Sequence, residues 1–320
     1  MQGKREHMNN MNYAQFARNE YSQFGEDGII EHVLERIPAL DKCCVEFGAW
    51  DGIHLSNTFN LIKSGGYRPV LIEADRKKFQ VLRKNMAQYG ATLVNEFVTF
   101  DGENTLDNIL GRTAIPRDFD FLSIDIDGND YWILDSLEEY RPKVICIEYN
   151  PSIPNEVEYV QPRDFSVKMG ASARSICKLA ERKSYALVAT TRCNLIFVDQ
   201  AYFPLFQIDD NRLAVLRDDS EVRIYAFSGY DGTIMHSGPI YLMWHNFKLR
   251  PDELQSIPAI LRKFPSDYNL FQKLLFIAFL FIRAPGETWH RALTTLRRHP
   301  FWKSKTDVRV WSISARRDLA

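Results

Sequence analysis

The sequence predicts an α/β fold, in which a doubly wound, mostly parallel sheet is followed by a mixed, partly helical C-terminal extension. Short apolar runs alternate with helix-like stretches over roughly the first 200 of the 320 residues. Such alternation is typical of βαβ units, which build parallel sheets covered on both faces. Two of the runs, at 69–74 and 144–149, are almost continuously apolar, as strands buried on both faces are. The alternation weakens after about residue 204.

The predicted elements follow one another in a regular order. A first helix is expected at 28–37, where apolar residues recur at helical spacing. Five strands are then expected at 43–47, 69–74, 92–100, 120–125 and 144–149. Helices are expected between them at 56–64, 76–89, 105–110 and 131–140. After a proline-rich loop, a helix and an antiparallel hairpin that would complete a seven-stranded sheet are expected at 172–183, 185–190 and 193–199.

Three segments are expected along the chain: a polar N-terminal segment at 1–20, the sheet domain at 21–204 and an extension at 205–320. The extension contains an apolar helix at 270–283, and from Arg283 onward nine basic residues stand against three acidic ones. A helix of this kind before a basic, Trp-containing segment could make peripheral contact with an anionic membrane. Packing within the chain or in a homodimer is the favoured alternative, because helices apolar on all sides are usually buried.

Composition narrows the class of protein further. With 45% hydrophobic and 25% charged residues, the chain resembles an ordinary globular protein. A net charge of −1 gives no support for bulk electrostatic binding of nucleic acid. The polar N-terminus has no apolar core of a secretory signal, and the longest apolar run, 274–282, is far shorter than the roughly 20 residues that span a bilayer. These features predict a cytoplasmic protein.

In an open parallel sheet, ligands bind beyond the carboxyl ends of the strands. The first strand ends in the turn VEFGAWDG at 45–52, whose glycines permit close backbone approach to a ligand. Its spacing is not G-x-G-x-x-G, which favours a ligand without a pyrophosphate. Glu73 ends the second strand, where an acid can accept hydrogen bonds from both ribose hydroxyls. Asp101 and Gly102 end the third, where a carboxylate could accept from an adenine amino group or merely form a turn.

Acidic residues also follow the fourth and fifth strands. Asp125 and Asp127 end the fourth strand, and Glu148 and Asn150 end the fifth, so adjacent strand ends should bring them together. Like-charged carboxylates in one cleft repel unless a cation or a shared proton offsets them. Three interpretations stay open: a magnesium or calcium site, a general base, and hydrogen bonds to a ligand. The run 127–130 could also be a turn and helix N-cap.

The residues FDFLSIDIDGNDYWILDSL and RPKVICIEYN, at 119–137 and 141–150, resemble the FkbM-like branch of class I S-adenosylmethionine-dependent methyltransferases. Further blocks fit the same group at 22–30 (SQFGEDGII), 45–62 and 170–199. The resemblance covers roughly residues 20–200 and implies a Rossmann-like methyltransferase sheet, S-adenosylmethionine binding and O-methylation, often of sugars in glycans, polysaccharides or natural products. Many relatives carry a Lys where this chain has Ser123, and the last 120 residues have no secure counterpart.

The resemblance also implies roles for individual residues. The methionine pocket would be shaped by Glu46, Gly48, Ala49, Asp51 and Gly52. Glu73 would hold the ribose, and Asp101 with Gly102 would border the adenine. Asp125 would lie beside the reacting methyl group, and the residues facing a small-molecule or glycan acceptor would be Asp127, Glu148 and Asn150.

Methyl transfer to a hydroxyl needs a group that takes up its proton. We expect Asp125 or Asp127 to accept it, directly or through a magnesium ion held by these two residues and Glu148. His54 is the competing base, although a lone histidine at a helix start is more often structural. The alternatives to an enzyme are a cofactor-binding protein without turnover and a membrane-associated partner in glycan assembly.

Overall fold

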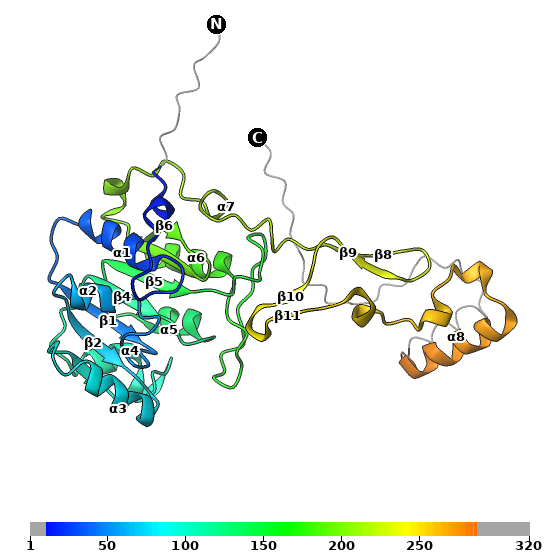
Figure 1. Cartoon of the computed structure of the whole chain (residues 1–320), viewed down its shortest axis with the longest axis horizontal. Coiled ribbons are helices and arrows are strands. Elements are labelled where there is room, and N and C mark those ends of the chain that lie inside the picture. The colour runs from blue at the N-terminus through cyan, green and yellow to red at the C-terminus, as the bar shows by residue number, and fades with distance from the viewer. Residues whose placement is uncertain (1–10, 284, 287–320) are drawn as a thin grey trace, which may run out of the picture. The chain divides into compact units, whose positions relative to one another are not determined.

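The computed structural model describes residues 11–283 and 285–286, and the chain divides into two compact units after Val222 (Figure 1). The first unit extends beyond residue 204, where the sequence places the end of the sheet domain. The reason is that residues up to Val222 return to the body of this unit. Arg217 is buried, and its guanidinium donates to the backbone oxygens of Pro151 (2.8 Å) and Ile153 (2.9 Å).

The first unit is built on a seven-stranded sheet with the order β3-β2-β1-β4-β5-β7-β6. Strands β1 to β5 are parallel, and β7 is antiparallel to both β5 and β6. The strands are β1 (Cys43–Phe47), β2 (Arg68–Ile72), β3 (Thr92–Val94), β4 (Phe121–Ile124), β5 (Val144–Glu148), β6 (Tyr185–Thr190) and β7 (Asn194–Asp199). The predicted doubly wound sheet and its antiparallel end hairpin are thus confirmed.

Strand β3 is shorter than predicted. The sequence predicts a strand over 92–100, but the ladder ends at Val94. Directly after it, the side-chain amide of Asn95 donates to the backbone oxygens of Glu73 (2.7 Å) and Ala74 (3.2 Å), which ties the departing chain to the end of β2. Residues 95–100 therefore run along the edge of the sheet as a loop.

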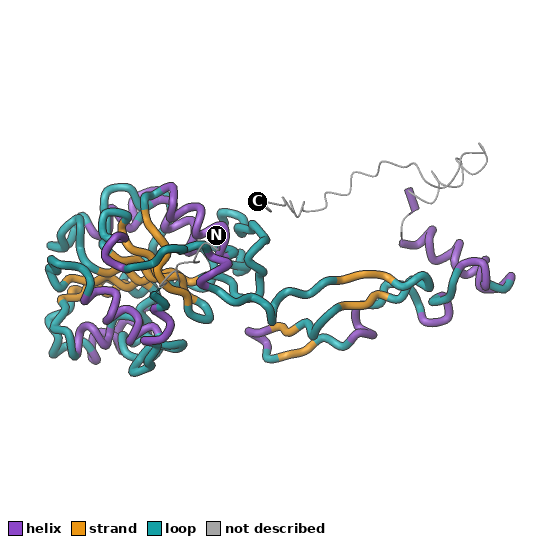
Figure 2. The backbone as a smooth tube through the Cα atoms, turned by 90° about the horizontal axis from the view of Figure 1, so that it is seen from above, coloured by secondary structure: helices purple, strands orange, loops and turns teal. Residues whose placement is uncertain are grey.

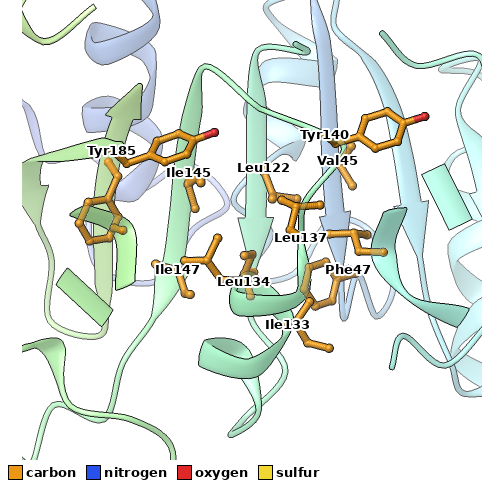
Figure 3. Packing of buried hydrophobic residues seen from close by; sticks show 14 of the residues in the cluster. Val45, Phe47, Leu122, Ile133, Leu134, Leu137, Tyr140, Ile145, Ile147 and Tyr185 are labelled. Carbon is orange, nitrogen blue, oxygen red and sulfur yellow. The ribbon is translucent and has the colours of Figure 1, made fainter. Parts of the chain in front are cut away.

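Helices lie on both sides of the strands (Figure 2). They are α1 (Glu26–Glu35), α2 (Phe59–Lys63), α3 (Arg76–Asn85), α4 (Leu106–Leu110), α5 (Asp130–Ser136), α6 (Ala173–Arg182) and α7 (Leu213–Leu216), with 3₁₀ turns η1 (Tyr13–Phe16), η2 (Gly102–Asn104) and η3 (Phe203–Phe206). Side chains of one strand alternate between the two faces. Accordingly Cys44 packs with residues of α1, α2 and α3, whereas Val45 packs with residues of α4, α5 and α6, in the cluster that Figure 3 shows.

The amino ends of the central strands are held by one buried carboxylate. Asp120 is fully buried directly before β4, and it accepts hydrogen bonds from the backbone N–H of Asp41 (3.2 Å) and Lys42 (2.7 Å) before β1. Its other partner is the buried ammonium of Lys143, before β5, at 2.7 Å. The side chain of Asp120 thus links the amino ends of β1, β4 and β5. Because these strands are parallel neighbours, this link also helps to position their carboxyl ends.

The second unit begins at Arg223 and has little regular structure. It contains two short antiparallel pairs, β8 (Ala226–Ser228) with β9 (Ile234–His236) and β10 (Tyr241–Leu242) with β11 (Phe247–Lys248). The 3₁₀ turns η4 (Met243–His245), η5 (Pro251–Leu254), η6 (Ala259–Leu261) and η7 (Pro265–Asp267) precede helix α8 (Leu270–Arg283), which spans the predicted apolar helix.

Of the helices that the structure describes, none combines the length and the apolar character required to cross a bilayer. The predicted basic tail beyond Arg283 lies, except for Pro285 and Gly286, outside the described residues.

We predict that Asp120→Ala lowers the free energy of unfolding of the first unit by about 3–5 kcal/mol, because the ammonium of Lys143 would stay buried without its closest carboxylate. Urea denaturation followed by circular dichroism measures this change. The control is Glu139→Ala, since Glu139 pairs with Arg117 at the surface, with side chains 60% and 71% exposed, and its loss should cost less than about 1 kcal/mol. Equal effects of the two substitutions would contradict the anchoring role.

Candidate active site

A cleft opens beyond the carboxyl ends of β1, β2 and β4. It encloses about 570 Å³ of space, part of which is open solvent. Its lining combines apolar residues with a few polar ones: Phe47, Gly48, Ile72, Glu73, Ala74, Glu96, Phe97, Val98, Ile126, Asp127, Asn129, Phe165 and Lys168. Of the sequence-predicted residues, Gly48, Glu73 and Asp127 therefore share one cleft.

The turn after β1 brings the backbone close to this cleft. Gly48 has a φ of +75°, and a Cβ at this position would lie 2.2 Å from the carbonyl oxygen of Asp125. A side chain is thus excluded both by the left-handed conformation and by the contact with the end of β4. Gly52 also has a positive φ, but its missing Cβ makes room for Leu82 of α3, so it serves packing and lies outside the cleft lining.

Glu73 stands at the end of β2 with its side chain directed back to this turn. It is only 6% exposed, and its two carboxylate oxygens accept from the backbone N–H of Trp50 (2.9 Å) and Asp75 (2.7 Å). Each oxygen has one hydrogen bond here and can accept another. The carboxylate is therefore fixed in orientation while it retains acceptor capacity toward the cleft.

The other predicted residues of the β1 turn have partners within the protein. The buried carboxylate of Glu46 accepts from the hydroxyls of Ser56 (2.6 Å) and Thr58 (2.7 Å), and burial raises its pKa. Asp51 accepts from the backbone N–H of Ile53 and His54, and Ala49 is buried. These side chains shape the turn, and their contact with a ligand stays a prediction.

Asp101 and Gly102 do not reach the cleft. Because β3 ends early, they lie at the start of η2, where the Asp101 side chain is 75% exposed and 3.8 Å from Arg163. The residues of this connection that line the cleft are 96–98, which the sequence places within a strand. The acid of this connection that lines the cleft is Glu96.

A loop far along the chain provides a wall that sequence reasoning missed. Phe165 lines the cleft and packs against Phe97, with ring centroids 4.8 Å apart, and is stacked on Phe100 at 4.5 Å. Lys168, from the same loop, also lines the cleft. Sequence reasoning did not find Phe165 and Lys168, because they are far in sequence from the strand ends. The one feature that could have indicated their role is the presence of aromatic residues in an otherwise polar loop.

The carboxyl ends of β4 and β5 bring three acids together, as predicted. One carboxylate oxygen from each of Asp125, Asp127 and Glu148 lies within 4.8 Å of the others. Asp127 is exposed and adopts a left-handed conformation with a φ of +56°, which is strained for a residue other than glycine and is common at functional sites. We call these three residues the acidic cluster.

The acidic cluster is crowded enough to hold a proton. Burial, followed by the charges of Asp125 and Asp130, raises the pKa of Glu148 far above the usual carboxyl range. Burial also raises the pKa of Asp125, and the charges of Asp130 and Asp127 add to this effect. One oxygen of each carboxylate lies within 4.8 Å of the other, and the pKa of Glu148 is raised more than that of Asp125. We infer that Glu148 is the group that holds a proton and that Asp125 is its ionised neighbour.

Two predicted site residues lie apart from the acidic cluster. The amide of Asn150 is engaged within its own loop, where it donates to the backbone oxygen of Met169 (2.8 Å) and accepts from Ser152. His54 is exposed, and its ring packs edge-on against Trp50 with centroids 5.2 Å apart. Neither belongs to the acidic cluster or the cleft lining, so their predicted roles in substrate binding and catalysis gain no support.

The block SQFGEDGII, at 22–30, contacts the amino end of β7 through Glu26, close to the acidic cluster. Glu26, at the start of α1, is fully buried and accepts from the side chains of Thr191 (2.5 Å) and Asn194 (3.1 Å). Asn194 pairs with Glu148 across β5 and β7. Asp27 is buried as well and accepts from three consecutive backbone N–H groups, at 20–22. The two acids fix the segment at 20–25 near the carboxyl edge of the sheet.

We predict that Glu148→Gln raises the melting temperature of the ligand-free protein at pH 8 by at least about 4 °C. An acid whose folded-state pKa is raised keeps a proton that the unfolded chain has lost, so stability falls as pH rises from about 4 through the folded-state pKa. Glutamine stays neutral and can still donate to Asp125. Thermal melts from pH 5 to about 9 measure the effect.

The control for this prediction is Glu103→Gln in the exposed turn η2, which should melt with the pH dependence of the wild type. A Glu148→Gln protein that is no more stable than the wild type at pH 8 would show that the acidic cluster is not strained by its charges.

The comparisons with solved structures give only distant likenesses. TrmK of M. capricolum, in complex with S-adenosyl-homocysteine, is 11% identical with a TM-score of 0.34, over 53% of this chain and 67% of that protein. A TehB-like S-adenosylmethionine-dependent methyltransferase from Corynebacterium glutamicum is 12% identical with a TM-score of 0.35, over 57% and 89%. The CurJ carbon methyltransferase is 8% identical with a TM-score of 0.37, over 54% of this chain and 52% of its own length, so the chain spans about half of it. These values are too low for any function to be carried over.

The comparison with protein families is more specific. No curated protein matches the chain. Residues 101–169, however, match the model of the methyltransferase FkbM domain. This segment runs through β4, α5 and β5 and carries the whole acidic cluster as well as Phe165 and Lys168. The match confirms, over this segment, the resemblance seen in the sequence.

Proposed function

We propose that this protein uses S-adenosylmethionine to methylate a hydroxyl oxygen, and that the acceptor is a sugar in a glycan, polysaccharide or natural product. The observation that carries the proposal is that Glu73 and Asp127 line the same cleft. Glu73 offers acceptors for a ribose, and Asp127 belongs to the acidic cluster that could take up a proton. The O-methylation of a sugar rests on the family resemblance.

The cleft has features that suit a nucleoside. The carboxylate of Glu73 can accept from both ribose hydroxyls, since each oxygen has a free acceptor position. Phe97 and Phe165 provide an aromatic surface against which a purine can pack. Gly48 allows the ligand to approach the backbone between β1 and β4. The sulfonium group of the bound cofactor would supply the methyl group.

The acidic cluster suits removal of the hydroxyl proton. As the methyl group passes from sulfur to the hydroxyl oxygen, the sulfonium charge is lost and the hydroxyl must release a proton. Burial and neighbouring charges raise the pKa of Asp125 to about 7, so this carboxylate can accept a proton close to neutral pH. Asp127, exposed at the cleft, is the other candidate base. Holding the acceptor oxygen in line with the methyl group would contribute about 7–11 kcal/mol in favourable cases.

The same three carboxylates could instead bind a divalent cation. Their oxygen-only ligand set and close spacing fit magnesium, which would offset the mutual repulsion of the charges and lower the pKa of a bound hydroxyl. In that case the residues that hold the ion would be Asp125, Asp127 and Glu148. A bound proton and a bound cation are thus alternative ways to offset the mutual repulsion of the three carboxylates.

We predict that Glu73→Gln weakens S-adenosylmethionine binding by about 10- to 100-fold, because two hydrogen bonds to a charged acceptor are lost or weakened. Isothermal titration calorimetry measures the dissociation constant. Asp101→Asn serves as the matched control: its side chain is exposed and outside the cleft lining, so its affinity should stay within about twofold of the wild type. No saturable heat with the wild-type protein would refute the proposal.

We predict that Asp125→Asn and Asp127→Asn together lower kcat by about 10²- to 10⁴-fold while cofactor affinity is retained. Formation of S-adenosylhomocysteine with a panel of sugar acceptors measures turnover. In the wild type, kcat should fall as pH decreases through an apparent pKa above the ordinary carboxyl value of about 4, because protonation of the base removes activity. His54→Gln, the control, should keep its activity.

A chelator and the double variant separate the remaining alternatives. Wild-type activity that is abolished by EDTA and restored by magnesium would assign the acidic cluster to a metal, whereas activity unaffected by EDTA would assign it to proton transfer. Full turnover of the double variant would exclude both roles. Saturable cofactor binding without turnover on any acceptor would favour the alternative of a binding protein without activity.

A further inference from the structure

The apolar helix of the second unit exposes the side that most helices bury. Helix α8 has five large apolar side chains that are between 50% and 81% exposed: Leu270, Phe271, Leu274, Ile277 and Ile282. Positions 270, 274 and 277 recur at helical spacing, and 271 and 282 flank them, so these residues form one continuous face. We call them the α8 face. Exposed apolar patches of this kind mark sites of interaction with a protein or a membrane.

The opposite side of α8 is already occupied. Gln272 is buried, and its side-chain amide donates to the backbone oxygen of Ile260 in η6 at 2.9 Å. The ring of Phe276 packs against that of Tyr268, with centroids 5.5 Å apart. The helix is therefore fixed to its own unit by one side while the α8 face points away from it. This arrangement suits a helix that lies flat on a surface.

The charged residues of helix α8 are of one sign. Helix α8 has no acidic residue, and its basic residues, Lys273 and Arg283, are exposed. From Arg283 onward the sequence carries nine basic and three acidic residues. An apolar face next to basic side chains is complementary to a bilayer with anionic headgroups, where the apolar residues enter the acyl boundary and the cations remain with the lipid phosphates.

We propose that the α8 face is a membrane-docking surface for a bilayer with anionic lipids. A second copy of the chain fits less well. In a two-fold dimer this surface meets its own copy, so the exposed Lys273 and Arg283 would find no acidic residue of α8 to pair with. Such unpaired cations oppose association, whereas the same charges favour an anionic bilayer.

The test uses the full chain and vesicles made either of phosphatidylcholine alone or with about 30% phosphatidylglycerol. In flotation assays, the wild type should bind the anionic vesicles, and binding should fall when salt is raised to about 0.5 M. Leu274→Glu combined with Ile277→Glu should reduce binding by at least about tenfold, because two acids replace inserted apolar side chains. Both positions are exposed, so the protein should keep its fold and its melting temperature.

The matched control is Val215→Glu on α7, since Val215 is exposed to almost the same degree as Ile277, 47% against 50%. This variant should bind vesicles within about twofold of the wild type. Failure of the wild type to float with anionic vesicles would overturn the proposal. A wild-type dimer in light scattering that the double Glu variant turns into a monomer, without vesicle binding, would assign the α8 face to self-association instead. Calorimetry with S-adenosylmethionine reports separately on the first unit, so the two proposals fail independently.

Discussion

Crowding of carboxyl groups at one edge of a parallel sheet is the constraint on which the candidate site depends. Adjacent parallel strands end at the same edge, so the acids that follow β4 and β5 meet whether or not their charges are compatible. Acids at this spacing repel one another when all are ionised, and together with burial this repulsion raises the pKa of Glu148 and of Asp125. The fold thus maintains a proton acceptor that an isolated carboxylate at neutral pH would not provide. The anchor at Asp120, at the opposite end of the strands, keeps this arrangement in place.

Much of this architecture follows from local sequence. The apolar runs identify the strands, the acids that end them identify Glu73 and the acidic cluster, and the topology then places these residues at one edge. What sequence reasoning missed depends on tertiary contact. Asn95 ends β3 through bonds to the chain after β2, and this removes Asp101 from the cleft. Phe165 lines the cleft from a loop, and the hydrophobic periodicity that identifies strands and helices does not predict the course of a loop.

The second unit shows a different limit. The hydrophobic pattern predicts a helix that ends at Arg283, and the structure has it. Composition alone does not show which side of an apolar helix is covered. The sequence therefore favours packing within the chain or in a homodimer, because helices that are apolar on all sides are usually buried. Gln272, the buried residue of α8, is polar, whereas the apolar residues around the α8 face are exposed. Its hydrogen bond to the backbone of η6, a tertiary contact, decides the orientation of the helix.

The central claim is that the cleft between Glu73 and Asp127 binds a sulfonium nucleoside. Hydrogen–deuterium exchange of the full chain, with and without S-adenosylmethionine, tests it directly, because bound ligand protects the backbone amides that it contacts or orders. We predict slower exchange in the turn at 48–52, after β2 at 73–75, and in the segments 96–98 and 165–168, which include residues that line the cleft. Unchanged exchange in all of these segments at saturating cofactor would contradict it.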